Sequence, residues 1–561
     1  MRLSCVVAMT LSILGCTQAV RSEIIPASRR ITWTPGIPGG IPEPPVTLSV
    51  KDYGAVADSV TDDYGAFRRA IAALPAAGGV VLIPAGTYRI DSSIVIGSSV
   101  VLRGEGSQRT RLRFGITDAS PCVSIITYGR GDWVNVVSGY TKGSTQLQVA
   151  DGSSFTAGTF AEIQQANDSA VMYTDSAWKQ SWSENSVGQV LIVQSVAGNT
   201  LILVEPLYLD YKASLNPQIR TQRFVERAGV ERLFITRTVS TADGATIAVK
   251  NAAYCWVHEV ESDHTRKAHV TCETVYGSVF RDSYFHHSYD YGGDGHGYGV
   301  TLGLHTTGCL TENNIFRHLR HAMMVQLGAC GNVFGYNYSL ENVQGTGETN
   351  LNQGWTPCDI SLHGHYPNYN LFEGNIVQEI DVADYWGPCG PGNTFLRNVV
   401  ESEGLDVLDQ THKQNIVGNV IGRGTYGILT EAGVDSTLAH GNLVRGALQW
   451  DPAIADHVVP VSYYLTAKPG FYGDMAWPST GSEITSGTNP ARERYLSGQY
   501  VAGVGRSRAP SLPGIGRMAP AAWYTLSGRS AAQPDLPDRR AGGLLLNRRT
   551  GASTRVLLLV R

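Results

Sequence analysis

The sequence predicts an all-β protein whose main body is a solenoid of stacked β-coils. Of its 561 residues, 63 are glycine and only 16% are charged, a composition typical of turn-rich β proteins. After residue 230, an aliphatic or aromatic pair followed by asparagine recurs at spacings of 23, 38, 23 and 21 residues, at Asn314, Asn337, Asn375, Asn398 and Asn419. This repeat indicates coils bonded through side-chain amides, and its longest spacing indicates an inserted loop of about 15 residues.

The N-terminus predicts export. Residues 1–20 contain one arginine, then an apolar stretch too short to span a bilayer, then small residues, which is the pattern of a secretory signal. The sequence "ILGC" also resembles a lipoprotein cleavage box, so a lipid anchor at Cys16 is an alternative. The Pro- and Gly-rich residues 21–46 are predicted to be a linker, and no other segment is suited to span a membrane. We therefore expect a bacterial protein that is secreted or held at the cell surface.

Residues 47–129 are expected to form the cap and the first coils. Thr61, Asp62 and Asp63 predict the start of a helix. An apolar stripe at helical spacing follows, formed by Ala66, Phe67, Ala70, Ile71 and Leu74.

This region carries a resemblance to a known family. The segments "DYGAVAD", "TDDYGAFRRAI", "GGVVLIPAGTYRI" and "VVLRGEG", within about residues 50–106, resemble the N-terminal module of the pectate-lyase superfamily, which contains rhamnogalacturonase-like and epimerase-like proteins. The resemblance implies that the helix caps a right-handed parallel β-helix. It does not select a reaction, because lyases, hydrolases, epimerases and phage tailspikes share the module.

Four further segments complete the predicted organisation. Alternating strands and turns over residues 130–225 predict an inserted β subdomain, and residues 226–480 are expected to form the main β-helix with an active groove. Residues 481–515 are predicted to be a linker. The tail, residues 516–561, is predicted to be a small C-terminal β module and resembles the sorting domains of some secreted bacterial proteins.

Charge and cysteine content narrow the possible partners. The net charge is −4 without a long basic run, which disfavours a nucleic-acid partner. Seven cysteines follow Cys16, and none has the C-x-x-C spacing of a zinc site. In an oxidising compartment, either Cys358 with Cys389 or Cys309 with Cys330 could form a disulfide.

Aligning the coils on the asparagine column groups the polar residues. Four positions after the column, successive coils carry His264, His287, His318, Glu341, Glu379 and Ser402. The preceding position carries Asp263, His286 and Arg317, and position seven carries Lys267, Asp290 and His321. Equivalent positions in a parallel stack lie roughly 4.8 Å apart. A solvated turn would tolerate any polar residue, but it does not explain histidine in three adjacent coils, so the column predicts an active strip.

The resemblance implies a polysaccharide lying along the stack, and three functions remain open. For β-elimination of a uronic-acid chain, Arg317 or Arg320 would neutralise the carboxylate, His287 or His318 would remove the proton, and Tyr289 or a neighbouring histidine would protonate the leaving oxygen. Side chains expected to contact the substrate are His264, Lys267, His286, Arg320, His321, Tyr298, His363, His365 and Trp355.

Hydrolysis is the second possibility and would need two carboxyl groups, from Asp290, Asp294 and Glu341. "GDGHGYGVTLG" resembles an element of polygalacturonases, but their other motifs are absent from the sequence. A non-catalytic, adhesin-like glycan-binding protein is the third possibility.

The sequence predicts no metal and no other cofactor. His363 and His365 point the same way in an extended chain, but no clear third ligand accompanies them. Calcium, which is common among pectate lyases, requires clustered acids, and Asp381 with Asp384 is only a weak candidate.

Overall fold

The structure is a computed structural model of the whole chain. It describes residues 23–351, 357–422, 427–484, 487–502, 545–547 and 555–557. The predicted signal peptide, the lipidation at Cys16, Trp355 and most of the C-terminal module lie outside these residues. The chain divides into two units, Met1–Gly503 and Val504–Arg561. In the second unit, β43 (Leu545–Asn547) pairs antiparallel with β44 (Arg555–Leu557). Among the described residues, no helix is long and apolar enough to cross a membrane.

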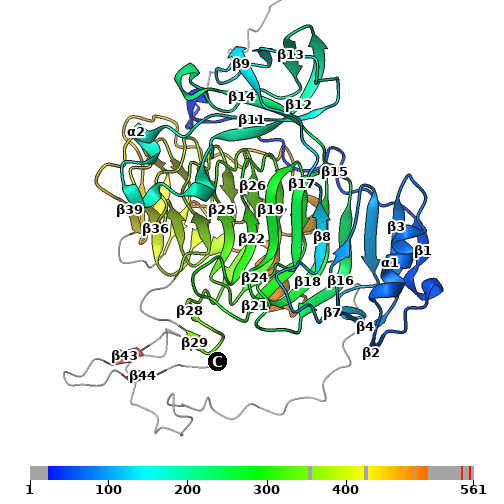
Figure 1. Cartoon of the computed structure of the whole chain (residues 1–561). Coiled ribbons are helices and arrows are strands. Elements are labelled where there is room, and N and C mark those ends of the chain that lie inside the picture. Colours follow the sequence, from blue (N-terminus) through cyan, green and yellow to red (C-terminus); the bar gives the residue numbers. More distant parts are fainter. Residues whose placement is uncertain are drawn as a thin grey trace, which may run out of the picture. The chain divides into compact units, whose positions relative to one another are not determined.

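The first unit is a parallel β-helix whose coils stack as three columns of strands (Figure 1). The first column contains β1 (Val46–Ser49), β3 (Gly79–Ile83), β6 (Val100–Gly104), β20 (Val279–Arg281), β23 (Leu310–Glu312), β26 (Val333–Gly335), β31 (Leu371–Glu373), β34 (Thr394–Leu396), β37 (Asn415–Val417) and β40 (Leu438–His440). The second contains β2 (Asp58–Asp62), β4 (Gly86–Ile90), β7 (Thr110–Phe114), β21 (Tyr284–Ser288), β24 (Ile315–Arg317), β27 (Tyr338–Leu340), β32 (Ile376–Val377), β35 (Val399–Val400), β38 (Val420–Ile421) and β41 (Asn442–Val444).

Two long strands, β16 (Gly229–Arg237) and β18 (Trp256–Thr265), run through both of these columns. The third column contains β5 (Ile94–Val95), β8 (Val123–Ile126), β17 (Ile247–Ala253), β19 (Ala268–Tyr276), β22 (Tyr298–Leu302), β25 (His321–Val325), β30 (Ile360–Leu362), β33 (Ile380–Val382), β36 (Gly404–Val407) and β39 (Gly427–Thr430). The predicted β-helix class is thereby confirmed.

The asparagine column stabilises the stack as predicted. The side-chain amide of Asn314 donates to Asn337 Oδ1 at 3.1 Å, and Asn337 donates to Asn375 Oδ1 at 2.9 Å. A second ladder, which the repeat did not reveal, runs through Asn332, Asn370 and Asn393. Because all these amides are buried and bonded to each other and to backbone groups, each rung satisfies polar groups that the interior would otherwise leave unpaired.

The N-terminal cap contains α1 (Tyr64–Ala72), which buries Ala66, Phe67 and Ala70 against the first coils. The helix begins at Tyr64 with Asp63, and not Thr61, at the N-cap position, and the Asp63 side chain makes no capping hydrogen bond. Its carboxylate accepts hydrogen bonds from the backbone N–H groups of Val56 and Ala57. Asp63 therefore stabilises the loop before the helix.

A closed antiparallel barrel is inserted in the sequence between the early coils and the main stack, and it lies on the outside of the solenoid, at the top of Figure 1. It consists of β9 (Val134–Ser138), β10 (Gln146–Val149), β11 (Phe160–Gln164), β12 (Gly188–Ala197), β13 (Thr200–Leu203) and β14 (Gln218–Gln222). Glu162 of the barrel lies 2.6 Å from His305 of the coil stack and 2.6 Å from Arg220. This buried cluster joins the barrel to the solenoid.

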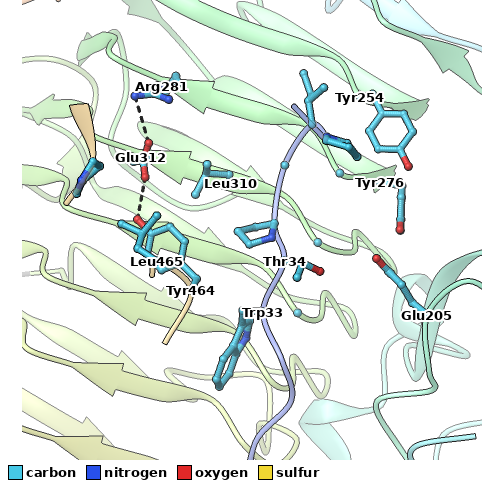
Figure 2. Close-up of a pocket in the computed structure, with 18 of the residues that line it drawn as sticks. Trp33, Thr34, Glu205, Tyr254, Tyr276, Arg281, Leu310, Glu312, Tyr464 and Leu465 are labelled. Carbon is cyan, nitrogen blue, oxygen red and sulfur yellow. Dashed lines mark hydrogen bonds and ion pairs between the residues drawn. The ribbon is translucent and has the colours of Figure 1, made fainter. Parts of the chain in front are cut away.

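Segments expected to be linkers pack on the solenoid over their described parts. Ile24, Ile25 and Trp33 are buried, and Trp33 Nε1 donates to the backbone of Tyr369 at 2.6 Å. In Figure 2 the segment from Trp33 onward runs through a cavity of about 550 Å³ on the first column. At the other end, α3 (Pro490–Leu496) packs beside β24. Apolar side chains within these Pro- and Gly-containing segments account for the packing.

The cysteines differ from expectation. The seven cysteines from Cys122 to Cys389 are buried free thiols, so neither Cys358 with Cys389 nor Cys309 with Cys330 forms a disulfide. Cys309 and Cys389 belong to the apolar core of the coil stack. They therefore act as small apolar side chains in separate coils.

Candidate functional site

The pairing of the second column brings the predicted strip residues together. Asp263 pairs with His286, and His286 pairs with Arg317. His264, His287, His318 and Glu341, each one residue further on, have φ angles of 45°, 58°, 55° and 58°. Four successive coils therefore turn through the left-handed region at the same position, with non-glycine residues that adopt this conformation only when the surroundings hold them there. We call the column of Asp263, His286, Arg317 and these four residues the strip.

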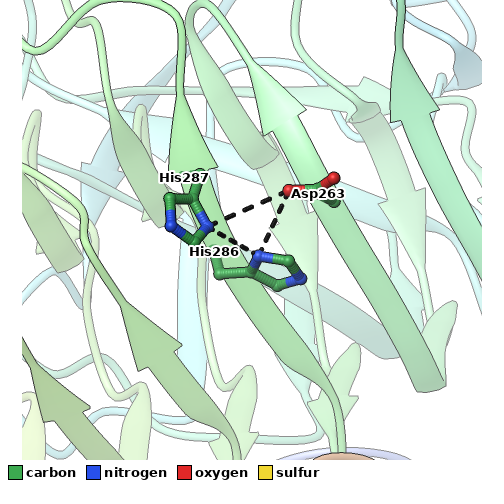
Figure 3. Close-up of side chains that lie close together, drawn as sticks. All are labelled: Asp263, His286 and His287. Atoms are coloured by element: carbon green, nitrogen blue, oxygen red, sulfur yellow. Dashed lines mark hydrogen bonds and ion pairs between the residues drawn. The ribbon is translucent and has the colours of Figure 1, made fainter. Parts of the chain in front are cut away.

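Asp263, at the near end of the strip, lies close to three of its histidines, two of which are drawn with it in Figure 3. Its Oδ1 lies 2.7 Å from Nδ1 of His264 and 3.2 Å from Nδ1 of His286, and Nδ1 of His287 is 4.0 Å away. Burial disfavours the charged carboxylate, but the His264 hydrogen bond and the neighbouring histidine charges outweigh it and lower the pKa of Asp263. In turn, although burial opposes it, Asp263 and then Glu348 raise the pKa of His264.

The surroundings of His287 shift its pKa in the opposite direction to that of His264. Burial, and then the charges of His286, His318 and His264, lower its pKa to about 4, while Asp263 opposes the shift. Its Nδ1 lies 2.8 Å from Nδ1 of His286, and its side chain is 30% exposed. A neutral, partly exposed imidazole therefore stands in the middle of the strip at neutral pH.

The far end of the strip carries an ion pair. Arg317 Nε lies 2.9 Å from Glu341 Oε2, and His318 Nδ1 is 3.7 Å from the same oxygen. His318, and then Arg317, lower the pKa of Glu341 to about 2, although partial burial opposes this. Arg317 is thus already neutralised by a carboxylate of the protein.

The near end of the strip opens into a pocket of about 330 Å³, lined in part by Arg111, Arg113, His264 and Tyr289. The Tyr289 ring lies 5.0 Å from that of His264, and its hydroxyl donates to the backbone of Arg237 at 2.9 Å. Burial, followed by the charges of nearby carboxylates, raises the pKa of Tyr289. The pocket joins two guanidinium groups to the histidines.

Sequence reasoning missed these two arginines. The register pairs Arg113 with Thr236 and Thr236 with Asp263, so Arg113 continues the strip into the first coils. The barrel interrupts the repeat between these coils, and the alignment therefore stopped at residue 230. Pairing across the insertion was the information that the sequence lacked.

Asp290 does not lie among the strip histidines. It is 6% exposed, and its carboxylate meets Arg266 and His296, each at 3.1 Å. Its other oxygen accepts the backbone N–H groups of Gly292 and Gly347, at 3.1 and 2.8 Å. These contacts lower the pKa of Asp290 against the effect of burial. They also hold the glycine-rich turn against the inserted hairpin of β28 (Gly345–Thr346) and β29 (Asn350–Leu351).

Five other predicted binding residues lie in the strands of the third column or in the turns next to them. Lys267, Tyr298, Arg320, His321 and His363 line a cavity of about 880 Å³, which we call the groove. Its walls include three aromatic side chains that the sequence did not single out as a group, Trp182, Tyr385 and Trp386, the first two being 48% and 60% exposed. Exposed rings of this kind suit stacking on sugar faces. The candidate residues thus divide between two neighbouring faces of the solenoid.

The side chains of His363 and His365 do not point the same way, as an extended chain would place them. Gly364 and His365 have φ angles of 66° and 55°, so the segment is not extended as the sequence analysis assumed. His363 Nδ1 lies 2.5 Å from Asp384 Oδ1, whereas His365 is buried and bonded to the backbone of Trp178 at 3.1 Å. Only His363 reaches the groove.

Carboxylates cluster beside the groove, and two of them, Asp381 and Asp384, line it. Ligand oxygens of Glu379, Asp381 and Asp406 lie within 4.8 Å of one another. Burial, and then mutual repulsion, raises the pKa of Glu379 to about 9 and that of Asp381 to about 7, and the pKa of Asp406 is also raised. In contrast, the pKa of Asp384 is lowered to about 2, because His363 outweighs burial.

Comparisons with known proteins support the fold. Residues 47–119 match the family described as rhamnogalacturonase A/epimerase, pectate lyase-like. The pre-neck appendage protein of Bacillus phage B103 is 35% identical over 104 residues, which is 18% of this chain and 10% of that protein. Mannuronan C5-epimerase AlgE5 of Azotobacter vinelandii is 41% identical over 73 residues, which is 12% of this chain and 7% of that one. The chain thus spans a tenth or less of these relatives.

Among solved structures, the tailspike gp61 of Pseudomonas phage phi297 superposes with a TM-score of 0.52 at 15% identity, covering 70% of this chain and 69% of that one. At this identity the similarity shows the fold alone. The comparisons therefore confirm a pectate lyase-like N-terminal module on a parallel β-helix, as the sequence resemblance indicated.

Proposed function

We propose that this protein is an exported polysaccharide lyase that cleaves a uronic-acid-containing chain by β-elimination at the strip. One observation carries the proposal: a neutral, partly exposed His287 stands between other histidines, beside a pocket that contains two arginines. Elimination needs a base for an acidic C–H proton and cations for the neighbouring carboxylate, and these groups supply both.

The steps follow from the positions of the side chains. Arg111 and Arg113 bind the uronate carboxylate, since Arg317 is already paired with Glu341. Nε2 of His287 removes the C5 proton, the C4–C5 double bond forms and the C4–O bond breaks. The Tyr289 hydroxyl protonates the departing oxygen. An anionic substrate beside His287 favours its protonated form, which assists the transfer.

A second reaction is favoured by a separate observation in the groove. Hydrolysis requires one protonated and one ionised carboxyl group flanking the bond. Asp381 suits the protonated role, because its pKa is raised to about 7, and Asp384 suits the ionised role, because its pKa is lowered to about 2. Both line the groove beside exposed aromatic rings. Glycoside hydrolysis in the groove is therefore the alternative, and glycan binding without cleavage is the third possibility.

Incubation with pectins, alginate, ulvan and glycosaminoglycans distinguishes these functions. Ultraviolet absorbance of an unsaturated product supports the lyase, and reducing ends without that absorbance support the hydrolase. Binding without either product supports a glycan-binding protein. Under the lyase proposal, His287→Asn abolishes cleavage and Asp381→Asn does not. The reverse result assigns cleavage to the groove and contradicts the proposal.

A further inference from the structure

We propose that Asp263, His286 and His287 bind a divalent transition metal ion such as Zn²⁺ within the strip (Figure 3). The ligand atoms are Nδ1 of each imidazole and Oδ1 of the carboxylate. Two imidazole nitrogens and one carboxylate oxygen are a ligand set that first-row transition metals take in proteins. Binding of the ion does not depend on the proposed elimination.

The three ligand atoms already lie close together. The two Nδ1 atoms are 2.8 Å apart. Asp263 Oδ1 lies 3.2 Å from Nδ1 of His286 and 4.0 Å from Nδ1 of His287. These separations leave a point about 2 Å from all three atoms, which is the usual distance from Zn²⁺ to its nitrogen and oxygen ligands. The three side chains can therefore bind one ion after only small movements.

The left-handed turn of the strip brings these atoms together. Consecutive side chains of an extended strand point to opposite faces. His287 has a φ of 58°, however, and its Nδ1 meets that of the preceding His286. In the coil before, the same turn at His264 places its Nδ1 at 2.7 Å from Asp263 Oδ1. His264 can keep this hydrogen bond while Oδ1 binds the ion, as outer-shell partners of ligating carboxylates do.

An unpartnered nitrogen of His286 indicates that a cation belongs at the other edge of its ring. His286 is 9% exposed, and its buried Nε2 has no hydrogen-bond partner among the described residues, with Glu261 Oε1 3.7 Å away. If neutral His286 carries its proton on Nδ1, the lone pair of Nε2 faces Glu261. If the proton is on Nε2, the lone pair of Nδ1 faces Asp263 Oδ1. A metal ion on Nδ1 removes both conflicts, because Nε2–H then faces a carboxylate, as is usual for metal-bound histidine.

A second proton on His286 would remove the same conflict. A proton on Nδ1 is shared along one hydrogen bond, either to Asp263 or to His287, whereas an ion bonds to all three atoms at once. The convergence of three ligand atoms therefore favours the ion, and measured Zn²⁺ binding distinguishes the two possibilities.

The site is open to solvent on one side. The side chains of Asp263 and His287 are 25% and 30% exposed, and Asp263 lines the pocket of about 330 Å³. Three protein ligands leave a further position for water or a saccharide oxygen. An ion on Nδ1 of His287 leaves the ring proton on Nε2, so the metal-bound form lacks a base. This consequence rests on the proposed function: the metal-free form carries out elimination, and Zn²⁺ inhibits it.

The experiment uses the untagged full chain after treatment with a chelator and removal of that chelator. Zn²⁺ binding is measured by calorimetry, and Cu²⁺ is added as an EPR probe, because nitrogen coupling reports the number of bound imidazoles. We expect micromolar or tighter Zn²⁺ binding and coupling to two imidazoles. His286→Gln should leave coupling to one imidazole and weaken Zn²⁺ binding by more than about 100-fold, since loss of an outer-shell partner alone costs about 10–100-fold. Asp263→Asn is a second ligand variant and should also weaken binding.

Two controls address the other groups of ligand-type side chains. His321→Gln and Asp406→Asn each change one of these groups and should bind Zn²⁺ as the wild type does. Thermal unfolding checks that every variant is folded. Absence of Zn²⁺ binding in the wild type overturns the proposal, and so does binding that His286→Gln retains or that His321→Gln loses. Neither readout depends on cleavage, so failure of the lyase assay leaves this test intact.

Discussion

Replacing His287 by asparagine tests the proposed base directly. Asparagine tolerates the left-handed conformation that His287 adopts at a φ of 58°, whereas alanine there would add backbone strain. The variant should therefore fold while lacking a proton acceptor. General-base catalysis contributes about 10²–10⁴-fold, so kcat for formation of the unsaturated product should fall by that factor. Substrate affinity should change little, because Arg111 and Arg113 remain in the pocket.

The pH dependence supplies a second measurement of the same group. With a pKa of about 4, His287 is neutral from pH 5 upward, so kcat/KM of the wild type should not lose activity between pH 7 and 5 through protonation of this base. Below that range activity should fall as the imidazole is protonated. His318→Asn removes a neighbouring charge that lowers the pKa of His287. The acid limb of the profile should therefore move to higher pH in this variant.

Lys413→Asn is a matched control, since Lys413 is exposed and also left-handed, at a φ of 59°. It should keep wild-type activity and stability. If His287→Asn retains turnover within a factor of a few of the wild type while folded, the assignment of the base is refuted. An acid limb that does not move in His318→Asn would show that another group controls it.

Three further predictions concern the groove and the fold. Asp381→Asn should leave formation of the unsaturated product unchanged but abolish any reducing ends released in excess of that product, with both measured on the same substrates. Asn337→Ala should lower the free energy of unfolding by about 3–5 kcal/mol in denaturant titrations, because the backbone N–H of Asn314 and the carbonyl of Thr311 lose their buried partners. The exposed Asn350→Ala is its control and should be neutral. His305 and Arg220 lower the pKa of Glu162 to about 2 against the effect of burial. The stability that ionised Glu162 gives the folded state is therefore present above about pH 4.5 and is lost as pH falls toward 2. In thermal unfolding across pH 2–6, Glu162→Gln should be less sensitive to acid than the wild type.

The repeat made part of the candidate site predictable. Aligning coils on the asparagine column predicted that His264, His287, His318 and Glu341 stack, and the strand pairing has that register. The prediction works because a parallel coil stack converts a sequence period directly into spatial adjacency. The spatial proximity of residues in the same column and a few coils apart can therefore be predicted from the sequence.

The sequence failed where position depends on turns or insertions. The sequence alignment placed Lys267 and His321 with the strip. The chain changes direction after the second column, however, so both residues line the groove. Arg113 was missed because the barrel separates its coil from Asp263. The periodic alignment measures position along a coil, and it does not measure the direction in which the next strand leaves.

The sequence by itself determined the stacked coils, the capping module and the polar column, because each is encoded by local periodicity. Only the tertiary structure decided that this column and the groove lie on different faces of the solenoid. It also decided that Asp384 meets His363 and that Cys358 lies against His321. These contacts join residues from different coils and an inserted loop, whose closure is set by packing of the whole stack and not by any local pattern.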